Sequence, residues 1–125
     1  MIVGTGVDLT EVHRIAETIA RYGSRFLERV YTPNEIRYCQ SKKNFAERFA
    51  ARFAAKEAAA KALGTGIGQG VTWTSIEVVR EPNGRPNIAF SGKAREFADR
   101  LGARRVSLSL SHTPDLAIAH VILED

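Results

Sequence analysis

The sequence has few residues that bind metals through sulfur or imidazole: one cysteine, Cys39, and three histidines, His13, His112 and His120. A single cysteine excludes a disulfide within the chain, and the scattered histidines do not match the spacing of zinc sites. No apolar run approaches the roughly 20 residues of a membrane-spanning helix. The opening segment, MIVGTGVDLTEV, has no basic region ahead of its apolar residues, so we expect no signal peptide. These absences predict a soluble cytoplasmic protein without membrane contact.

Composition bounds the size and the partners of the protein. With 125 residues, of which 44% are apolar, the chain is expected to form one domain that spans residues 1–125. The formal net charge of +4 favours an acidic partner or an anionic ligand. Zinc-finger spacing and an aromatic RNP-like strand are both absent, so we expect no nucleic acid as partner.

Hydrophobic periodicity predicts alternating strands and helices, with no internal repeat or linker. Predicted strands cover 2–9, 73–80, 87–91, 105–112 and 116–123, and predicted helices cover 11–30, 33–40, 44–63 and 92–102. Thr32 and Glu35 have the spacing of a capping box, Asn44 and Glu47 repeat it, and Gly64 ends the longest helix. The two C-terminal hairpins are antiparallel. The sequence therefore predicts an α+β fold in which the long helix packs against a small antiparallel sheet.

Asp8 lies inside an apolar strand, GTGVDL. A carboxylate buried there without a partner would cost roughly several kcal/mol. An arginine, the backbone N–H groups of a following turn, or a bound cation could offset that cost. The alternative is a turn or N-cap aspartate for the helix that begins near Glu11, and the sequence leaves both interpretations open.

The longest predicted helix carries a row of residues at steps of four: Phe45, Phe49, Phe53, Glu57 and Lys61. Successive members rotate by only about 40° around the helix. We expect the phenylalanines to be buried and to bring Glu57 and Lys61 to the edge of the buried zone. The alanines on both flanks of the row are small, and we expect them to leave room for a phosphate-bearing ligand. The alternative is a solvated Glu57–Lys61 pair worth about a few tenths of a kcal/mol.

Two carboxylates and a lysine suit a magnesium ion together with a phosphate. Mg²⁺ takes one or two protein carboxylates and fills its other positions with water and phosphate oxygens. A nearby lysine meets a further phosphate oxygen as a point charge. This hypothesis requires Asp8 and Glu57 to converge, which the sequence does not establish.

Three arginines lie at positions i, i+7 and i+11 of the predicted helix 11–30: Arg14, Arg21 and Arg25. They would form a single basic stripe. Arginine suits bidentate capture of carboxylates, so the stripe favours docking of an acidic helix. An ordinary solvated face is the alternative, because acidic residues share the helix.

His112 ends the strand SLSLSH, in which serines and leucines alternate. Adjacent strand residues point to opposite faces, so Ser111 is not placed to act as a nucleophile with His112 as its base. Beside the turn, His112 could donate to a phosphate or could be structural. The glycine-rich segment 64–70 follows a helix, whereas nucleotide-binding glycine loops follow a strand, so we interpret it as a hinge or lid.

Five segments, in order along the chain, resemble one known family. They are GVDLTEVHRI (6–15), FAAKEAAAKALG (53–64), WTSIEVV (73–79), NGRP (83–86) and SLSHTPDLAIAHVI (109–122). The family is the short bacterial 4'-phosphopantetheinyl transferases, the holo-[acyl-carrier-protein] synthases. The resemblance covers nearly the whole chain, and the aspartate of GxD together with the KEAxxKA helix is specific. It implies an α+β unit that transfers the phosphopantetheine of coenzyme A to a serine of apo-acyl carrier protein. The other product is 3',5'-ADP, and the reaction supports fatty acid biosynthesis.

The resemblance also implies roles for individual residues. Asp8 and Glu57 would hold Mg²⁺, with water and the pyrophosphate of coenzyme A completing its shell. Lys61 would hold a phosphate and stabilise developing charge, so Glu57 and Lys61 would be the catalytic residues. Either Glu57 or a metal-bound water could take the proton of the attacking serine, and the sequence does not choose.

The implied assembly is a homotrimer with active sites between subunits. By analogy with larger two-unit relatives, His112 would reach the coenzyme A that a neighbouring subunit binds. The stripe of Arg14, Arg21 and Arg25 would dock acyl carrier protein, which is small, helical and strongly acidic. The competing hypothesis is a non-catalytic binder of an acidic protein or nucleic acid. Asp8 discriminates between the two, because a simple basic binder needs no carboxylate in an apolar strand.

Overall fold

The structure, a computed structural model, describes residues 1–125 and contains five α-helices, one short 3₁₀ helix and five strands. The strands are β1 (Ile2–Glu11), β2 (Ile76–Arg80), β3 (Pro86–Phe90), β4 (Arg105–His112) and β5 (Leu116–Glu124). The helices are α1 (Val12–Tyr22), α2 (Ser24–Val30), α3 (Pro33–Gln40), α4 (Phe45–Leu63) and α5 (Gly92–Leu101), with the 3₁₀ helix η1 (Trp73–Ser75) before β2. The predicted α+β class is confirmed.

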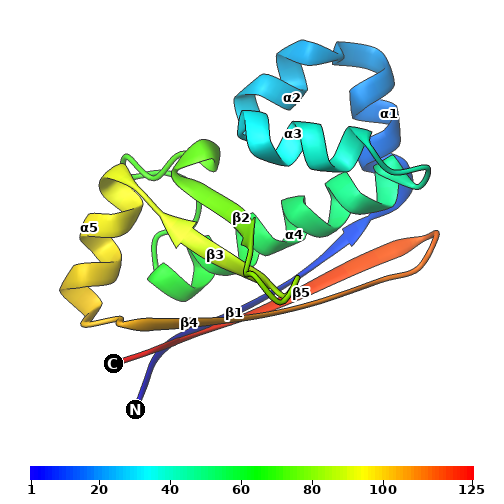
Figure 1. Ribbon diagram of the computed structural model, residues 1–125. Coiled ribbons are helices and arrows are strands. Elements are labelled where there is room, and N and C mark those ends of the chain that lie inside the picture. The colour runs from blue at the N-terminus through cyan, green and yellow to red at the C-terminus, as the bar shows by residue number, and fades with distance from the viewer.

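The strands form two antiparallel sheets. β5 is the middle strand of the larger sheet, between β1 and β4, while β2 and β3 form a separate hairpin. Figure 1 shows α4 lying along the upper face of the larger sheet, with α1, α2 and α3 above the N-terminal part of α4. Both C-terminal hairpins agree with the sequence prediction. The pairing of the first strand with the last was not predicted, because no local pattern links the two ends of the chain.

The long helix α4 belongs to two hydrophobic cores. One core lies between the C-terminal part of α4, α5 and the two sheets, and the other packs α1, α2 and α3 on the N-terminal part of α4. The helix therefore sets the distance between the sheet and the small helices. None of the helices combines the length and the apolarity needed to cross a bilayer.

Close contact between backbones explains the alanines of α4. A methyl group built on Gly6 of β1 would lie 2.0 Å from the carbonyl oxygen of Ala58, and one on Gly4 would lie 2.2 Å from that of Ala62. Glycine is required on β1 at both positions. Ala58 and Ala62 are 0% and 5% exposed against the strand. The expectation that these alanines leave room for a ligand is therefore wrong: they let the sheet approach.

Some boundaries differ from the periodic pattern. Gly23, with a φ of 55°, ends α1 and divides the predicted helix 11–30 into α1 and α2. Residues 73–75 form η1 rather than the start of a strand. Phe45 is 45% exposed whereas Phe49 is 1% exposed, so the row at steps of four enters the core one turn later than expected.

One of the two predicted capping boxes forms. The Thr32 hydroxyl accepts from the backbone N–H of Glu35, and the Glu35 carboxylate accepts from the backbone N–H of Thr32 at 2.7 Å. The second prediction is wrong, because Asn44 makes no capping hydrogen bond. Its expected partner, Glu47, is directed instead to His112 on β4.

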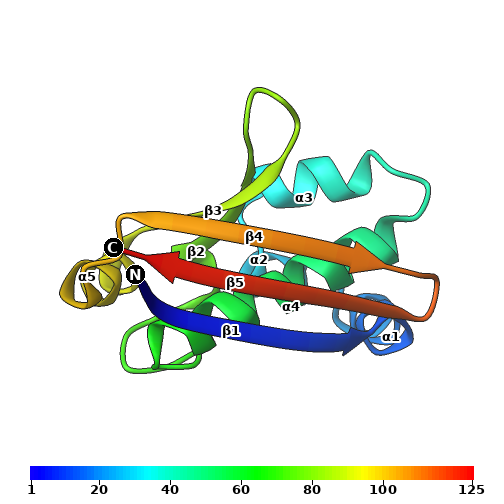
Figure 2. The same ribbon diagram turned by 90° about the horizontal axis from the view of Figure 1, so that it is seen from below.

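The view from below shows that no helix covers the outer face of the larger sheet (Figure 2), and several apolar side chains on its strands are exposed. Val7 and Leu9 on β1 are 53% and 61% exposed, and Leu116 and Ile118 on β5 are each 41% exposed. Leu9 lies opposite Ile118 in the register, so these side chains form one patch, which we call the outer apolar patch. Exposed apolar patches of this kind are typical of protein contact surfaces.

Cys39 on α3 is expected to be chemically inert in the native protein. Its side chain is fully buried, and burial raises the pKa of the thiol to about 11. The thiolate is the reactive form, so we expect an aromatic disulfide reagent to react at least about 100-fold more slowly with the folded than with the unfolded chain. The reaction is followed by absorbance with and without denaturant. Comparable rates in the two states would contradict the buried placement.

Candidate active site

Asp8 is held on β1 by partners from two elements. Lys61 Nζ, on α4, lies 3.1 Å from Asp8 Oδ1 and also donates to the carbonyl oxygen of Val7 at 3.1 Å. The Thr10 hydroxyl donates to Asp8 Oδ2 at 3.1 Å. The Asp8 side chain is 13% exposed. The alternative of an N-cap aspartate is wrong, since Glu11 occupies the N-cap position of α1.

Asp8 and Glu57 converge at one hollow, as the magnesium hypothesis requires. The hollow has a volume of about 340 Å³ and lies between β1, α1 and α4, with Phe26 of α2 and Phe53 of α4 on its wall. Burial raises the pKa of Glu57, and the neighbouring Asp8 raises it further, while Lys61 opposes the shift. The two carboxylates therefore crowd each other at the edge of the core.

Lys61 pairs across to the sheet rather than along its own helix. Its ion pair is with Asp8, and no ion pair joins it to Glu57 one turn away. The alternative of a solvated Glu57–Lys61 pair is therefore wrong. An ammonium group has three N–H donors. Two of them are used on Asp8 and on the Val7 carbonyl, so one remains for a ligand.

The donor set fits a magnesium ion that is shared with a phosphate ligand. Asp8 and Glu57 are neighbouring like charges at one hollow, and a divalent cation relieves such repulsion. No third carboxylate, histidine or cysteine joins them in a larger cluster. Zinc and calcium sites usually take more protein ligands than two. Mg²⁺ is the ion that takes one or two carboxylates and leaves its remaining positions to water and phosphate.

The three predicted docking arginines do not form one helical stripe, because Gly23 separates α1 from α2. Arg14 lines the hollow of Asp8 and Glu57. Arg25 lines a neighbouring hollow of about 420 Å³ on α1 and α2, and the two hollows share Thr18 and Phe26. Arg21 lines neither and lies 5.5 Å from the Tyr22 ring. Arg14 and Arg25 therefore border one basic surface, beside which Arg21 lies on α1.

His112 is placed at the opposite end of α4 from Lys61. It is the last residue of β4, and its Nδ1 lies 3.0 Å from Glu47 Oε1 in the first turn of α4. The structure thus does not bring His112 to Asp8 and Glu57 within one chain. The expected contact of His112 with the coenzyme A of a neighbouring subunit stays a prediction.

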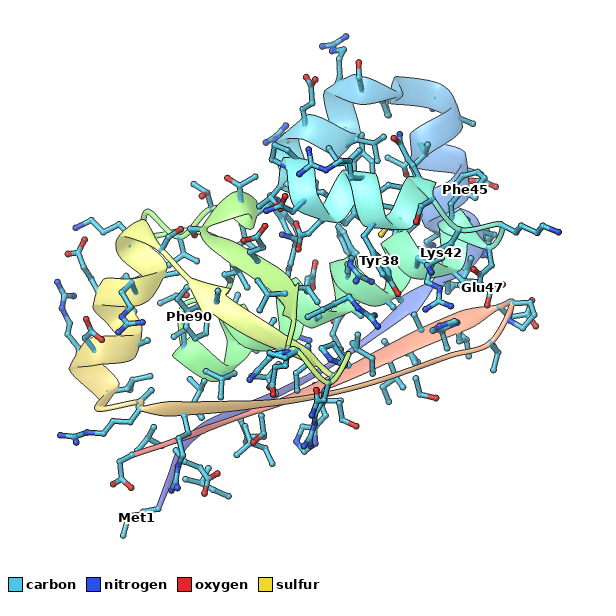
Figure 3. All side chains as sticks on the ribbon, in the orientation of Figure 1. Met1, Tyr38, Lys42, Phe45, Glu47 and Phe90 are labelled. Atoms are coloured by element: carbon cyan, nitrogen blue, oxygen red, sulfur yellow. The ribbon has the colours of Figure 1, made fainter.

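A cluster of cations surrounds Tyr38, and no sequence pattern predicted it. Arg52 lies 4.2 Å over the Tyr38 ring, Arg80 lies 4.9 Å from it and Lys42 lies 5.1 Å from it. Arg52 is 4% exposed, and its Nε is the one buried side-chain donor without a partner. Figure 3 shows Tyr38 and Lys42 together beside α4. These residues come from α3, α4, β2 and the α3–α4 connection, so no periodic signal could have joined them.

Comparison with known proteins identifies the family of the chain. The chain matches the family model of the 4'-phosphopantetheinyl transferase superfamily over residues 4–119. It is 65% identical to the holo-[acyl-carrier-protein] synthase of Koribacter versatilis over 100% of both chains. The fold is similar to the crystal structure of that enzyme from Neisseria meningitidis, with a TM-score of 0.90, 34% identity and 100% of both chains covered. It is also similar to the Helicobacter pylori enzyme in complex with coenzyme A, with a TM-score of 0.84, 34% identity, and 96% of this chain and 99% of that chain covered.

The protein belongs to the 4'-phosphopantetheinyl transferase superfamily. Within it, the chain is an enzyme of the holo-[acyl-carrier-protein] synthase type, which confirms the resemblance seen in the sequence. Such an enzyme transfers 4'-phosphopantetheine from coenzyme A to a serine of apo-acyl carrier protein, a step that serves fatty acid biosynthesis. The competing hypothesis of a non-catalytic basic binder is not supported.

Proposed function

We propose that Asp8 and Glu57 hold a Mg²⁺ ion on which this transfer depends, and that Lys61 binds a phosphate of coenzyme A. The observation that carries the proposal is the convergence of the two carboxylates at one hollow beside a lysine with a free N–H. In this role Mg²⁺ supplies charge neutralisation to the pyrophosphate of coenzyme A and to the leaving 3',5'-ADP.

The residues of the hollow then act on the two reacting groups. The serine oxygen of the carrier attacks the β-phosphorus, forms the new O–P bond and displaces 3',5'-ADP. Glu57 accepts the serine proton, because its carboxylate lines this hollow. Lys61 donates its remaining N–H to a phosphate oxygen as negative charge builds on the leaving group.

We also propose that the enzyme works as a homotrimer with active sites between subunits. The outer apolar patch supports self-association, because the chain itself leaves Val7, Leu9 and Ile118 without cover. His112 would then contact coenzyme A held mainly by the neighbouring subunit. The cations around Tyr38 would add positive charge for the phosphates of the substrate. We take residues 1–125 as one catalytic unit that acts in the cytoplasm.

The proposal is tested by mixing the protein with coenzyme A, apo-acyl carrier protein and Mg²⁺ and measuring the mass of the carrier. We expect the carrier to gain one phosphopantetheine. Chelation of the metal with EDTA should stop the gain, and excess Mg²⁺ should restore it. A gain that continues unchanged in EDTA would exclude the proposed metal dependence, even though the transferase activity itself would stand.

The proposed docking surface for acyl carrier protein predicts a selective effect on one substrate. Replacing Arg14 and Arg25 with alanine should raise KM for the carrier by about fivefold or more and leave KM for coenzyme A within about twofold. Adding the Arg21→Ala change should extend this effect. The matched control is Arg95→Ala with Arg100→Ala, which makes the same charge change on α5. Equal changes in both KM values, or an equal effect of the control, would argue against docking at this surface.

A further inference from the structure

Glu47 and His112 form a hydrogen-bonded contact between two parts of the chain that are 65 residues apart. Glu47 lies in the first turn of α4, close to the end of the β4–β5 hairpin (Figure 3). His112 Nδ1 lies 3.0 Å from Glu47 Oε1, and the two side chains are 23% and 21% exposed. Because both side chains are largely buried, their interaction is screened less by solvent and salt than that of an exposed surface pair.

The contact determines which nitrogen of His112 remains for a ligand. A carboxylate oxygen can only accept, so Nδ1 carries a hydrogen and donates it to Glu47. Nε2 makes no hydrogen bond within the chain, and it is not enclosed, since Arg52 Nε is the one buried atom without a partner. A ring that is held at Nδ1 has lost its freedom to turn. Nε2 is therefore presented to the outside in a defined direction.

We propose that Glu47 is a positioning residue for coenzyme A: it orients His112 so that Nε2 meets a phosphate of the substrate. For Nε2 to donate while Nδ1 donates to Glu47, the imidazole must carry both hydrogens and a positive charge. The Glu47 carboxylate balances that charge on the side of the ring that faces away from the phosphate. The inference rests on the proposed function in one respect, the contact between His112 and coenzyme A.

A purely structural tie between α4 and the hairpin would use the same contact, and the two roles differ in their kinetics. A structural tie predicts lower stability and an unselective loss of activity when Glu47 is removed. A positioning role predicts a selective rise in KM for coenzyme A, because only that substrate meets His112. It also predicts that Glu47 has no effect once His112 is gone.

The experiment measures kcat and both KM values for the parent, His112→Ala, Glu47→Ala, Glu47→Gln and the double alanine variant. We expect His112→Ala to raise KM for coenzyme A by about tenfold, the loss of one hydrogen bond to a charged group. We expect Glu47→Ala to raise it by about fivefold, with kcat and KM for the carrier within about twofold. Glu47→Gln keeps an acceptor for Nδ1 and should recover most of this loss. The double variant should be no worse than His112→Ala.

Glu96→Ala is the matched control, because Glu96 is an exposed carboxylate on α5 and should leave all three parameters unchanged. If His112→Ala raises KM for coenzyme A but Glu47→Ala does not, the positioning role is wrong and the proposed function stands. If His112→Ala itself has no effect, both the proposed contact of His112 and the role of Glu47 are overturned. A rise in both KM values after Glu47→Ala, or additive effects in the double variant, would leave only the structural tie.

Discussion

Glu57→Gln is expected to abolish Mg²⁺-dependent transfer and to leave the fold intact. The change keeps the size of the side chain and removes one of the two carboxylates at the hollow. Glu57 is proposed to serve both as a metal ligand and as the proton acceptor. Its loss should therefore lower kcat/KM by about 10²- to 10³-fold or more. Asp8 is the like-charged neighbour of Glu57 and raises its pKa. Loss of that repulsion should leave the urea midpoint unchanged or slightly higher.

The assay follows transfer to the carrier across a titration of Mg²⁺, with urea unfolding of the same preparation. Glu96→Gln, the same chemical change at an exposed position of α5, is the control and should behave as the parent. Near-normal turnover of Glu57→Gln at every Mg²⁺ concentration would remove Glu57 from the mechanism. A large loss of stability in this variant would show that Glu57 has a structural role instead.

Lys56→Met is expected to destabilise the protein more than any substitution at the active site. Lys56 and Glu35 are both fully buried, and Lys56 Nζ lies 2.7 Å from Glu35 Oε1. Lys56 also donates to the carbonyl oxygens of Trp73 and Ile76 at 3.0 and 2.6 Å. Burial lowers the pKa of Lys56, and Glu35 opposes that shift. Removing one partner of a buried pair leaves an uncompensated charge and costs about 3–5 kcal/mol.

The pair joins α3, α4, η1 and β2, since Glu35 also accepts from the backbone N–H of Val78 at 2.8 Å. We therefore expect Lys56→Met and Glu35→Leu each to lower the free energy of unfolding strongly, measured from urea midpoints. The double variant should be less unstable than the sum of the two single variants, because it leaves no buried charge unpaired. Lys93→Met, at an exposed position of α5, is the control. A loss below about 1 kcal/mol for Lys56→Met would contradict the structural role of the pair.

Two adjacent residues of one motif thus have separate roles. Lys56 and Glu57 follow each other in the KEAxxKA segment, but successive residues on a helix lie about 100° apart. Lys56 points to α3 and β2, and Glu57 points to β1 and the hollow. The sequence pattern predicted a role for Glu57 and none for Lys56. A charged residue inside an apolar segment signals a partner, and that signal was used for Asp8 but not for Lys56.

The predictions that failed were made from short-range sequence patterns, at residues whose contacts are set by distant parts of the chain. The alanines of α4 were interpreted as space for a ligand, but Ala58 and Ala62 are buried where the backbone of α4 lies against Gly6 and Gly4 of β1, a strand far away in the sequence. The arginine stripe assumed a continuous helix, and a single left-handed residue, Gly23, divides it. Glu47 has the spacing of a capping residue, yet its carboxylate contacts His112.

The sequence by itself determined most element types, the capping box at Thr32 and the end of α4 at Gly64, and it singled out Asp8, Glu57 and Lys61 as candidate site residues. These features depend on interactions within a few residues and on the nature of each side chain, so a local pattern contains them. Only the tertiary structure decided that Asp8 faces Glu57, that Lys61 pairs with Asp8, and that His112 is held by Glu47. Those contacts arise when α4 packs across β1 and β5. Packing between distant segments produces no periodic pattern in the sequence, so it could not be predicted from one.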